Sequence, residues 1–241
     1  MALTESRPET LALPSGPTAE RPHPLGLFSR PKTTTGWRSW VTTVDHKRIG
    51  IMYGCAAVFF LVFAGSEALL IRSQLWAPRG TLLSADTYNQ VLTMHGTTGV
   101  FLVVMPLGAA FANYLMPLQI GARDVAFPRL NAFSFWCFLM GGIFLNTSWL
   151  LGGGPDGGWF MYAPNSGVVF SPTHGIDFWN IGIIITGIAS LVGAINLITT
   201  VLNLRAPGMT LMKMPVFTWM GLVTQLLLVF ALPVISVALF L

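Results

Sequence analysis

Residues 91–118 read VLTMHGTTGVFLVVMPLGAAFANYLMPL, and almost all of them are apolar or uncharged. Roughly 20 helical residues of this kind cross the hydrocarbon core of a bilayer, so the stretch predicts a transmembrane helix. It also contains His95. Ionisable side chains are rare in membrane-spanning helices, and they usually face the interior of a helix bundle. His95 is therefore the first candidate functional residue.

The rest of the chain also has the composition of a membrane protein. Of its 241 residues, 53% are hydrophobic and 9% are charged, whereas roughly 25% of residues are charged in an average soluble domain. Blocks long enough to cross a bilayer occur at residues 51–71, 91–118, 132–151, 178–202 and 216–241. The sequence predicts an all-α fold, a polytopic membrane helix bundle with five transmembrane helices.

Lysine and arginine are shared unevenly between the two sides of this predicted bundle. One side carries Lys32, Arg38, Lys47 and Arg48 before the first helix, Arg123 and Arg129 in the second loop, and Arg205 and Lys213 in the fourth. The other side carries Arg72 and Arg79, and its long loop at residues 152–177 has neither residue type. Cytoplasmic segments are enriched in both, so the N-terminus is predicted to be cytoplasmic. This bias accounts for the net charge of +4 without a nucleic-acid partner.

Two domains are predicted from the composition. Residues 1–40 contain many prolines and few large apolar side chains. Such a segment buries too little surface to offset the entropy of ordering, which indicates a flexible polar cytoplasmic tail. Residues 41–241 form the transmembrane domain.

His95 and Asp124 lie at opposite sides of the predicted membrane. Residues 95–118 span roughly 35 Å of helix axis, which puts His95 near the outer end of the second helix and Asp124 past its cytoplasmic end. Neutral imidazole is a good ligand for a transition metal or a haem iron. A hydrogen bond from His95 to a neighbouring helix explains the residue equally well. In a haem-free ion transporter, the two residues would belong to an ion pathway.

Several motifs resemble subunit I of the haem-copper oxidases. They are DHKRIGIMY at 45–53, LIRS at 70–73, MHGT at 94–97, NYLMPLQIGARDVAFPRLN at 113–131, GAIN at 193–196, RAPGMT at 205–210 and MP at 214–215. The similarity runs from about Val41 to Leu241. It implies the first part of a twelve-helix subunit of a proton-pumping enzyme that reduces dioxygen to water.

The resemblance implies a cofactor site at the outer side. His95 would be an axial ligand of the iron of a low-spin haem, of the a type, with Arg72 at the haem periphery and Tyr88 beside it. Arg72 also fits a side chain that extends its charge into the outer headgroups. The ligands of the high-spin haem and of the copper ion CuB follow the fifth helix in this family, so they are expected beyond Leu241.

The resemblance also implies a proton pathway that begins at the cytoplasmic side. Asp124 would stand at its mouth, with Asn113 and Asn131 above it and Ser190 and Asn196 further along. A solvated loop in which Asp124 pairs with Arg123 or Arg129 is the alternative. Small and hydroxyl residues on the fourth helix also favour close helix packing, which is compatible with a pathway.

The electron donor is inferred from departures from the family pattern. Glu67 and Gln90 match positions of the quinol site in bo-type quinol oxidases, but Phe63 and Thr87 replace its arginine and histidine. We therefore expect cytochrome c as the donor, with quinol as the alternative. The other partners implied are oxidase subunits II and III and the lipid of a bacterial plasma membrane.

Overall fold

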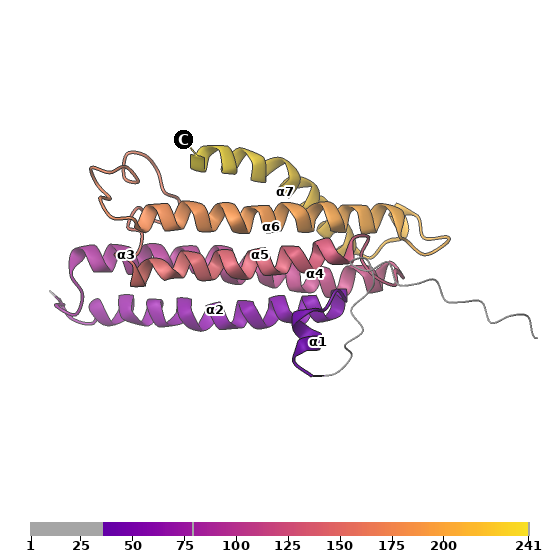
Figure 1. Cartoon of the computed structure of the whole chain (residues 1–241), viewed down its shortest axis with the longest axis horizontal. Helices are drawn as coiled ribbons and strands as arrows, with labels where there is room; N and C mark the ends of the chain where they lie inside the picture. Colours follow the sequence, from indigo (N-terminus) through magenta and orange to yellow (C-terminus); the bar gives the residue numbers. More distant parts are fainter. Residues whose placement is uncertain (1–35, 79, 241) are drawn as a thin grey trace, which may run out of the picture. The chain divides into compact units, whose positions relative to one another are not determined.

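The computed structural model describes residues 36–78 and 80–240. Its long helices are α2 (His46–Gln74), α5 (Pro128–Asn146), α6 (Gly175–Asn203), α7 (Val216–Phe240) and one continuous helix made of α3 (Ala85–Thr97), η2 (Thr98–Val104) and α4 (Met105–Gln119). Short helical turns are α1 (Arg38–Val41), η3 (Thr147–Leu150) and η4 (Leu211–Lys213). The long helices run side by side along one axis (Figure 1).

The predicted helix bundle is confirmed. Within the described residues there are five helices long and apolar enough to cross a membrane, and there is no β-strand. The first four begin three to six residues before the predicted bounds, because polar first turns precede the apolar blocks, whereas α7 begins at Val216 as predicted. Asp45 and Ser84 cap two of these turns, with side chains that accept hydrogen bonds from the N–H groups of Lys47 and Thr87. Of the predicted tail, residues 1–35 lie outside the described residues, and α1 begins at Arg38.

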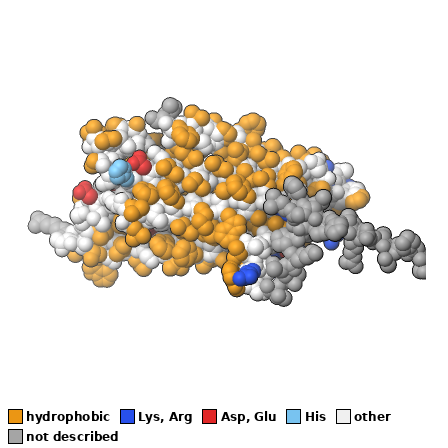
Figure 2. Space-filling model, viewed as in Figure 1, with side chains coloured by type: hydrophobic (Ala, Val, Ile, Leu, Met, Phe, Trp, Pro, Cys, Tyr) orange, Lys and Arg blue, Asp and Glu red, His pale blue; other side chains and the backbone are white. Residues whose placement is uncertain are grey.

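Hydrophobic side chains cover most of the middle of the face in view, whereas acidic and histidine side chains gather at one end (Figure 2). Many large apolar residues of α2 and α7 are exposed, among them Val58, Val62, Leu227 and Phe230. In water such a surface is unfavourable, but in a bilayer the lipid chains solvate it. The surface therefore agrees with the composition.

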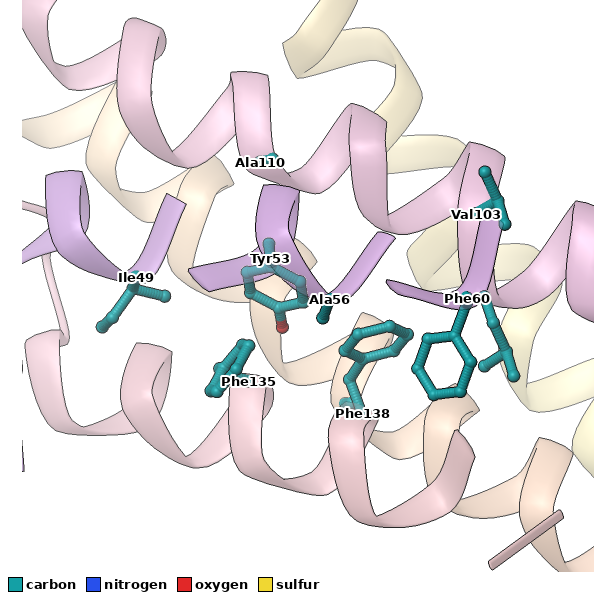
Figure 3. Packing of buried hydrophobic residues seen from close by; sticks show 10 residues of the cluster. Ile49, Tyr53, Ala56, Phe60, Val103, Ala110, Phe135 and Phe138 are labelled. Atoms are coloured by element: carbon teal, nitrogen blue, oxygen red, sulfur yellow. The ribbon is translucent and has the colours of Figure 1, made fainter. Parts of the chain in front are cut away.

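The largest apolar cluster joins α2 to α5 and to the helix formed by η2 and α4 (Figure 3). The ring of Tyr53 meets Phe135 edge-on, with centroids 5.1 Å apart, and lies 5.3 Å from Phe138. Phe60 continues the aromatic row toward the other end of α2. These contacts hold α2 against α5 over much of its length.

Helices α5 and α6 approach each other through glycine. A Cβ atom added to Gly182 of α6 would lie 2.7 Å from Cβ of Leu145, and one added to Gly141 of α5 would lie 2.9 Å from Cγ2 of Thr186. Small residues at such positions let membrane helices pack closely. Contact between α5 and α6 positions the polar side chains described below.

Gly182→Ala should destabilise the bundle by about 1–3 kcal/mol, because the added methyl group overlaps Leu145. Gly187→Ala is the matched control on the same helix, since its Cβ would meet only Ser236 Oγ at 3.9 Å. Thermal unfolding of the purified full-length complex measures both. Equal stability of the two variants would contradict the close approach.

Candidate functional site

His95 is held by a neighbouring helix. Its Nδ1 lies 2.9 Å from the carbonyl oxygen of Ala64 in α2, and a carbonyl can only accept, so Nδ1 carries the proton. This fixes the tautomer and leaves the lone pair on Nε2. No described residue makes a hydrogen bond with Nε2. Histidines that bind metals commonly have the other ring nitrogen fixed in this way.

The loop between η3 and α6 is fastened to α3, the helix that contains His95. The backbone N–H of Gly158 donates to Thr93 Oγ1 at 2.9 Å, and that of Gly154 donates to Gln90 Oε1 at 3.1 Å. Trp159 packs on the backbone at Gly96, where an added Cβ would lie 3.1 Å from the Trp159 Cβ. The residue next to His95 therefore has an indole against it.

The two other residues expected near a cofactor lie at the same end of the bundle. Arg72 is exposed in the last turn of α2, eight residues beyond Ala64, which is about 12 Å along the helix axis. Tyr88 is half-buried in the first turns of α3. The structure brings His95 to α2, and it places Arg72 and Tyr88 on the flanking helix ends.

At the opposite end, the loop that contains Asp124 is fastened to α6. Asp124 Oδ1 accepts a hydrogen bond from Val125 N–H. Asn196 Oδ1 accepts from Phe127 N–H at 2.8 Å, and Asn196 Nδ2 donates to the Phe127 carbonyl. Thr200 Oγ1 accepts from Ala126 N–H. Asn196 is fully buried and both ends of its amide contact the loop, so it positions the segment that follows Asp124.

A cavity of about 530 Å³ lies between α4, α5, α6 and α7. Asn113 and Ser190 line it, whereas Asp124, Asn131 and Asn196 do not. Tyr53 and Ser134 also line it, and their hydroxyl groups lie 2.8 Å apart. Ser134 donates to the carbonyl of Ala189, so Tyr53 donates to Ser134. Most of the lining is apolar, with these polar groups along it.

Three buried polar atoms near this end lack a hydrogen-bond partner among the described residues. They are Oδ1 of Asn113, Nδ2 of Asn131 and Nε2 of His46. His46 Nδ1 donates to the carbonyl of Asn113, 2.8 Å away, so this histidine touches a predicted pathway residue. Buried polar groups of this kind are usually satisfied by ordered water. The chemistry of the region therefore suits hydration.

Sequence reasoning missed His46, Tyr53 and Ser134. The signal was available in part, because Ser134 follows Asn131 by three residues and Tyr53 follows His46 by seven. Both spacings place the two members on one face of a helix. The sequence does not show which helix each of these faces contacts, because that depends on how the helices pack.

A family model described as cytochrome c and quinol oxidase polypeptide I matches residues 48–241. The chain belongs to this family. It is thus a multi-pass membrane protein of the subunit I family of haem-copper oxidases, and the resemblance seen in the motifs is confirmed.

Individual relatives of this oxidase family agree. The chain is 52% identical to cytochrome c oxidase subunit 1 of Bacillus subtilis (strain 168) over 86% of its length and 33% of the relative's. It is 54% identical to that of Bacillus sp. (strain PS3), over 83% and 32%. It is 45% identical to quinol oxidase subunit 1 of Bacillus spizizenii, over 84% and 31%. The chain spans about a third of the length of these relatives.

Asn196→Ala should loosen the loop after Asp124, because Phe127 N–H loses its acceptor at a cost of about 1–3 kcal/mol. Thr199→Ala is the control, since Thr199 Oγ1 donates only to Ile195 of its own helix. Amide hydrogen exchange at Phe127 in the full-length complex should accelerate in the first variant alone. Unchanged exchange in Asn196→Ala would show that the loop is held by other contacts.

Proposed function

We propose that the chain is the part of subunit I that holds the first ligand of a low-spin haem and the proton entrance of a respiratory oxidase. The complete complex takes electrons from cytochrome c and reduces dioxygen to water at a high-spin haem and CuB, coupled to proton pumping. One observation carries the proposal most: the Ala64 carbonyl fixes the His95 tautomer whose Nε2 can bind iron.

The residues around His95 fit a low-spin haem of the a type. The fixed imidazole offers a neutral nitrogen ligand, and Arg72 supplies a cation that suits acidic groups on the haem edge. Tyr88 lies about two turns before His95 on the same helix, and the indole of Trp159 packs at Gly96, so both add flat surface near the proposed ligand. Such a haem relays single electrons when it is bound. A second ligand for the iron and the ligands of CuB would come from elsewhere in the complex.

His95→Ala should abolish the low-spin haem band in a reduced-minus-oxidised spectrum of the full-length complex, because no iron ligand remains at that position. His174→Ala is the control. His174 is strongly exposed and pairs with Asp177 in the first turn of α6, so its loss should leave the band intact. A band that survives in His95→Ala would exclude the ligand assignment.

For protons, we propose a route from Asp124 toward the cavity. A carboxylate at the surface can collect protons, and neutral amides such as Asn113 and Asn131 can bind water without holding a charge. Ser190, Ser134 and Tyr53 would continue the polar lining beyond Asn113. In this proposal Asn196 serves the route by holding the Asp124 loop.

Asp124→Asn should slow proton uptake and weaken pumping in vesicles, while the haem spectra stay unchanged. Asp45→Asn is the matched control, because asparagine caps a helix about as well as aspartate and Asp45 lies at the same end of the bundle. Stopped-flow uptake with a pH dye compares the two. Equal uptake by both variants and the wild type would remove Asp124 from the route.

Two features favour cytochrome c over quinol as the electron donor. Gln90 Oε1 already accepts the N–H of Gly154, so it is engaged by the loop. Phe63 faces outward and Thr87 bonds to Ser84 at the start of α3, so neither replaces a charged partner for a quinol headgroup. Glu67 is the feature that favours quinol, because it is buried and its Oε2 lacks a partner among the described residues.

The proposed setting is a bacterial plasma membrane with the N-terminus in the cytoplasm. Arg48 at the start of α2, Arg129 at the start of α5 and Lys213 before α7 lie at one end of the bundle, which supports this orientation. Subunits II and III of the oxidase are the proposed protein partners. The family match gives no support to the haem-free transporter considered from composition alone.

A further inference from the structure

The helix that connects the two proposed sites contains a wider, π-helical turn near its middle. Between α3 and α4, residues Thr98–Val104 form the π-helix η2, and Met105 N–H donates to the carbonyl of Val100, five residues back. An α-helix makes this bond to the residue four back. Short π-helical turns are rare and occur frequently at functional sites.

The sequence explains why the turn widens at this point. Pro106 follows directly, and proline has no N–H and crowds the carbonyl four residues before it, here that of Leu102. Membrane helices accommodate proline by local changes of helix type, because no water is present to satisfy the freed groups. The wide turn lies on the N-terminal side of Pro106, where this crowding occurs.

The wide turn changes which residues share a face. Asn113 follows His95 by 18 residues, which is five turns of an α-helix at about 3.6 residues per turn. In a uniform α-helix, Asn113 would therefore point in the same direction as His95. With one extra residue in the turn, Tyr114 points in the direction of His95 instead, and Asn113 is rotated from it by about 100°.

Contacts on both sides of η2 agree with one extra residue. His95 faces α2, where it meets Ala64. In α4 the residues that face α2 are Ala110 and Tyr114, because a Cβ added to Gly50 of α2 would lie 2.9 Å from the Ala110 carbonyl and 3.1 Å from Cβ of Tyr114. Asn113 instead lines the cavity together with residues of α6 and α7.

We infer that η2 sets the rotation of α4 relative to α3: its extra residue turns the side chain of Asn113 into the cavity, while the Asn113 carbonyl still accepts from His46 of α2 and His95 stays on α2. Val100 lies in the wide turn and does not line the cavity, whereas Pro106, which follows the turn, is part of the cavity wall. The rotation set by η2 is independent of the proposed function. The consequence of this rotation for a haem and for protons rests on the proposed function.

Three variants of the full-length subunit in its complex test the inference. Deletion of Val100, which is 37% exposed, removes the extra residue and leaves a uniform α-helix in which His95 and Asn113 keep their directions. Deletion of Val58 in α2, which is 58% exposed, is the matched control, because α2 has no wide turn to absorb the loss. Insertion of an alanine after Val100 adds a second extra residue and rotates Asn113 by about 100°.

Deletion of Val100 should leave the yield of assembled complex, the low-spin haem band and proton uptake within about twofold of the wild type, whereas the other two variants lose about tenfold or more of the assembled complex. If deletion at Val100 is as damaging as deletion at Val58, or if the insertion is tolerated equally well, the inference is overturned. Yield of the complex is read without reference to haem, so a failed haem assignment would be seen separately as a band that survives in His95→Ala.

Discussion

Inside a bilayer every backbone N–H and C=O has to find its partner within the protein, and this constraint governs the whole structure. It makes the chain helical wherever it is apolar, and it favours polar side chains that bond to a neighbouring helix or to their own, as His46, Tyr53 and Ser134 do. The bond from His95 to the carbonyl of Ala64 is the most consequential example. It ties two helices together and also selects the ring nitrogen that remains free.

The two ends of the bundle use polar ties for different purposes. At one end, Thr93 and Gln90 accept from a glycine-rich loop and bring an aromatic side chain against the helix that contains His95. At the other end, Asn196 and Thr200 accept from the loop that carries Asp124. Between these ends the helices pack through aromatic and small side chains. Tyr53 and Ser134 form a hydrogen-bonded pair among them. Apolar packing thus separates the two ends at which the candidate site residues lie.

Hydropathy predicted the five helices because it depends on the number of consecutive apolar residues, which the sequence contains directly. The candidates His95 and Asp124 followed from rarity and from motifs. The hydrogen bonds of Asn196 to the Phe127 backbone could not be predicted, because the sequence does not show whether an amide on a helix face bonds to water or to a loop. The wide turn η2 was also missed, since hydropathy carries no information on residues per turn and Pro106 alone does not specify how a helix adapts.

The way the loop between η3 and α6 is fastened has a consequence for how this surface can diverge among related proteins. Both ties to α3 use backbone N–H groups of the loop, at Gly154 and Gly158, and both acceptors are side chains of the helix. Apart from Trp159, which packs at Gly96, side chains elsewhere in the loop can therefore change without breaking either tie to α3. The exposed surface of the loop can thus vary while its two backbone ties keep it beside the helix that contains His95.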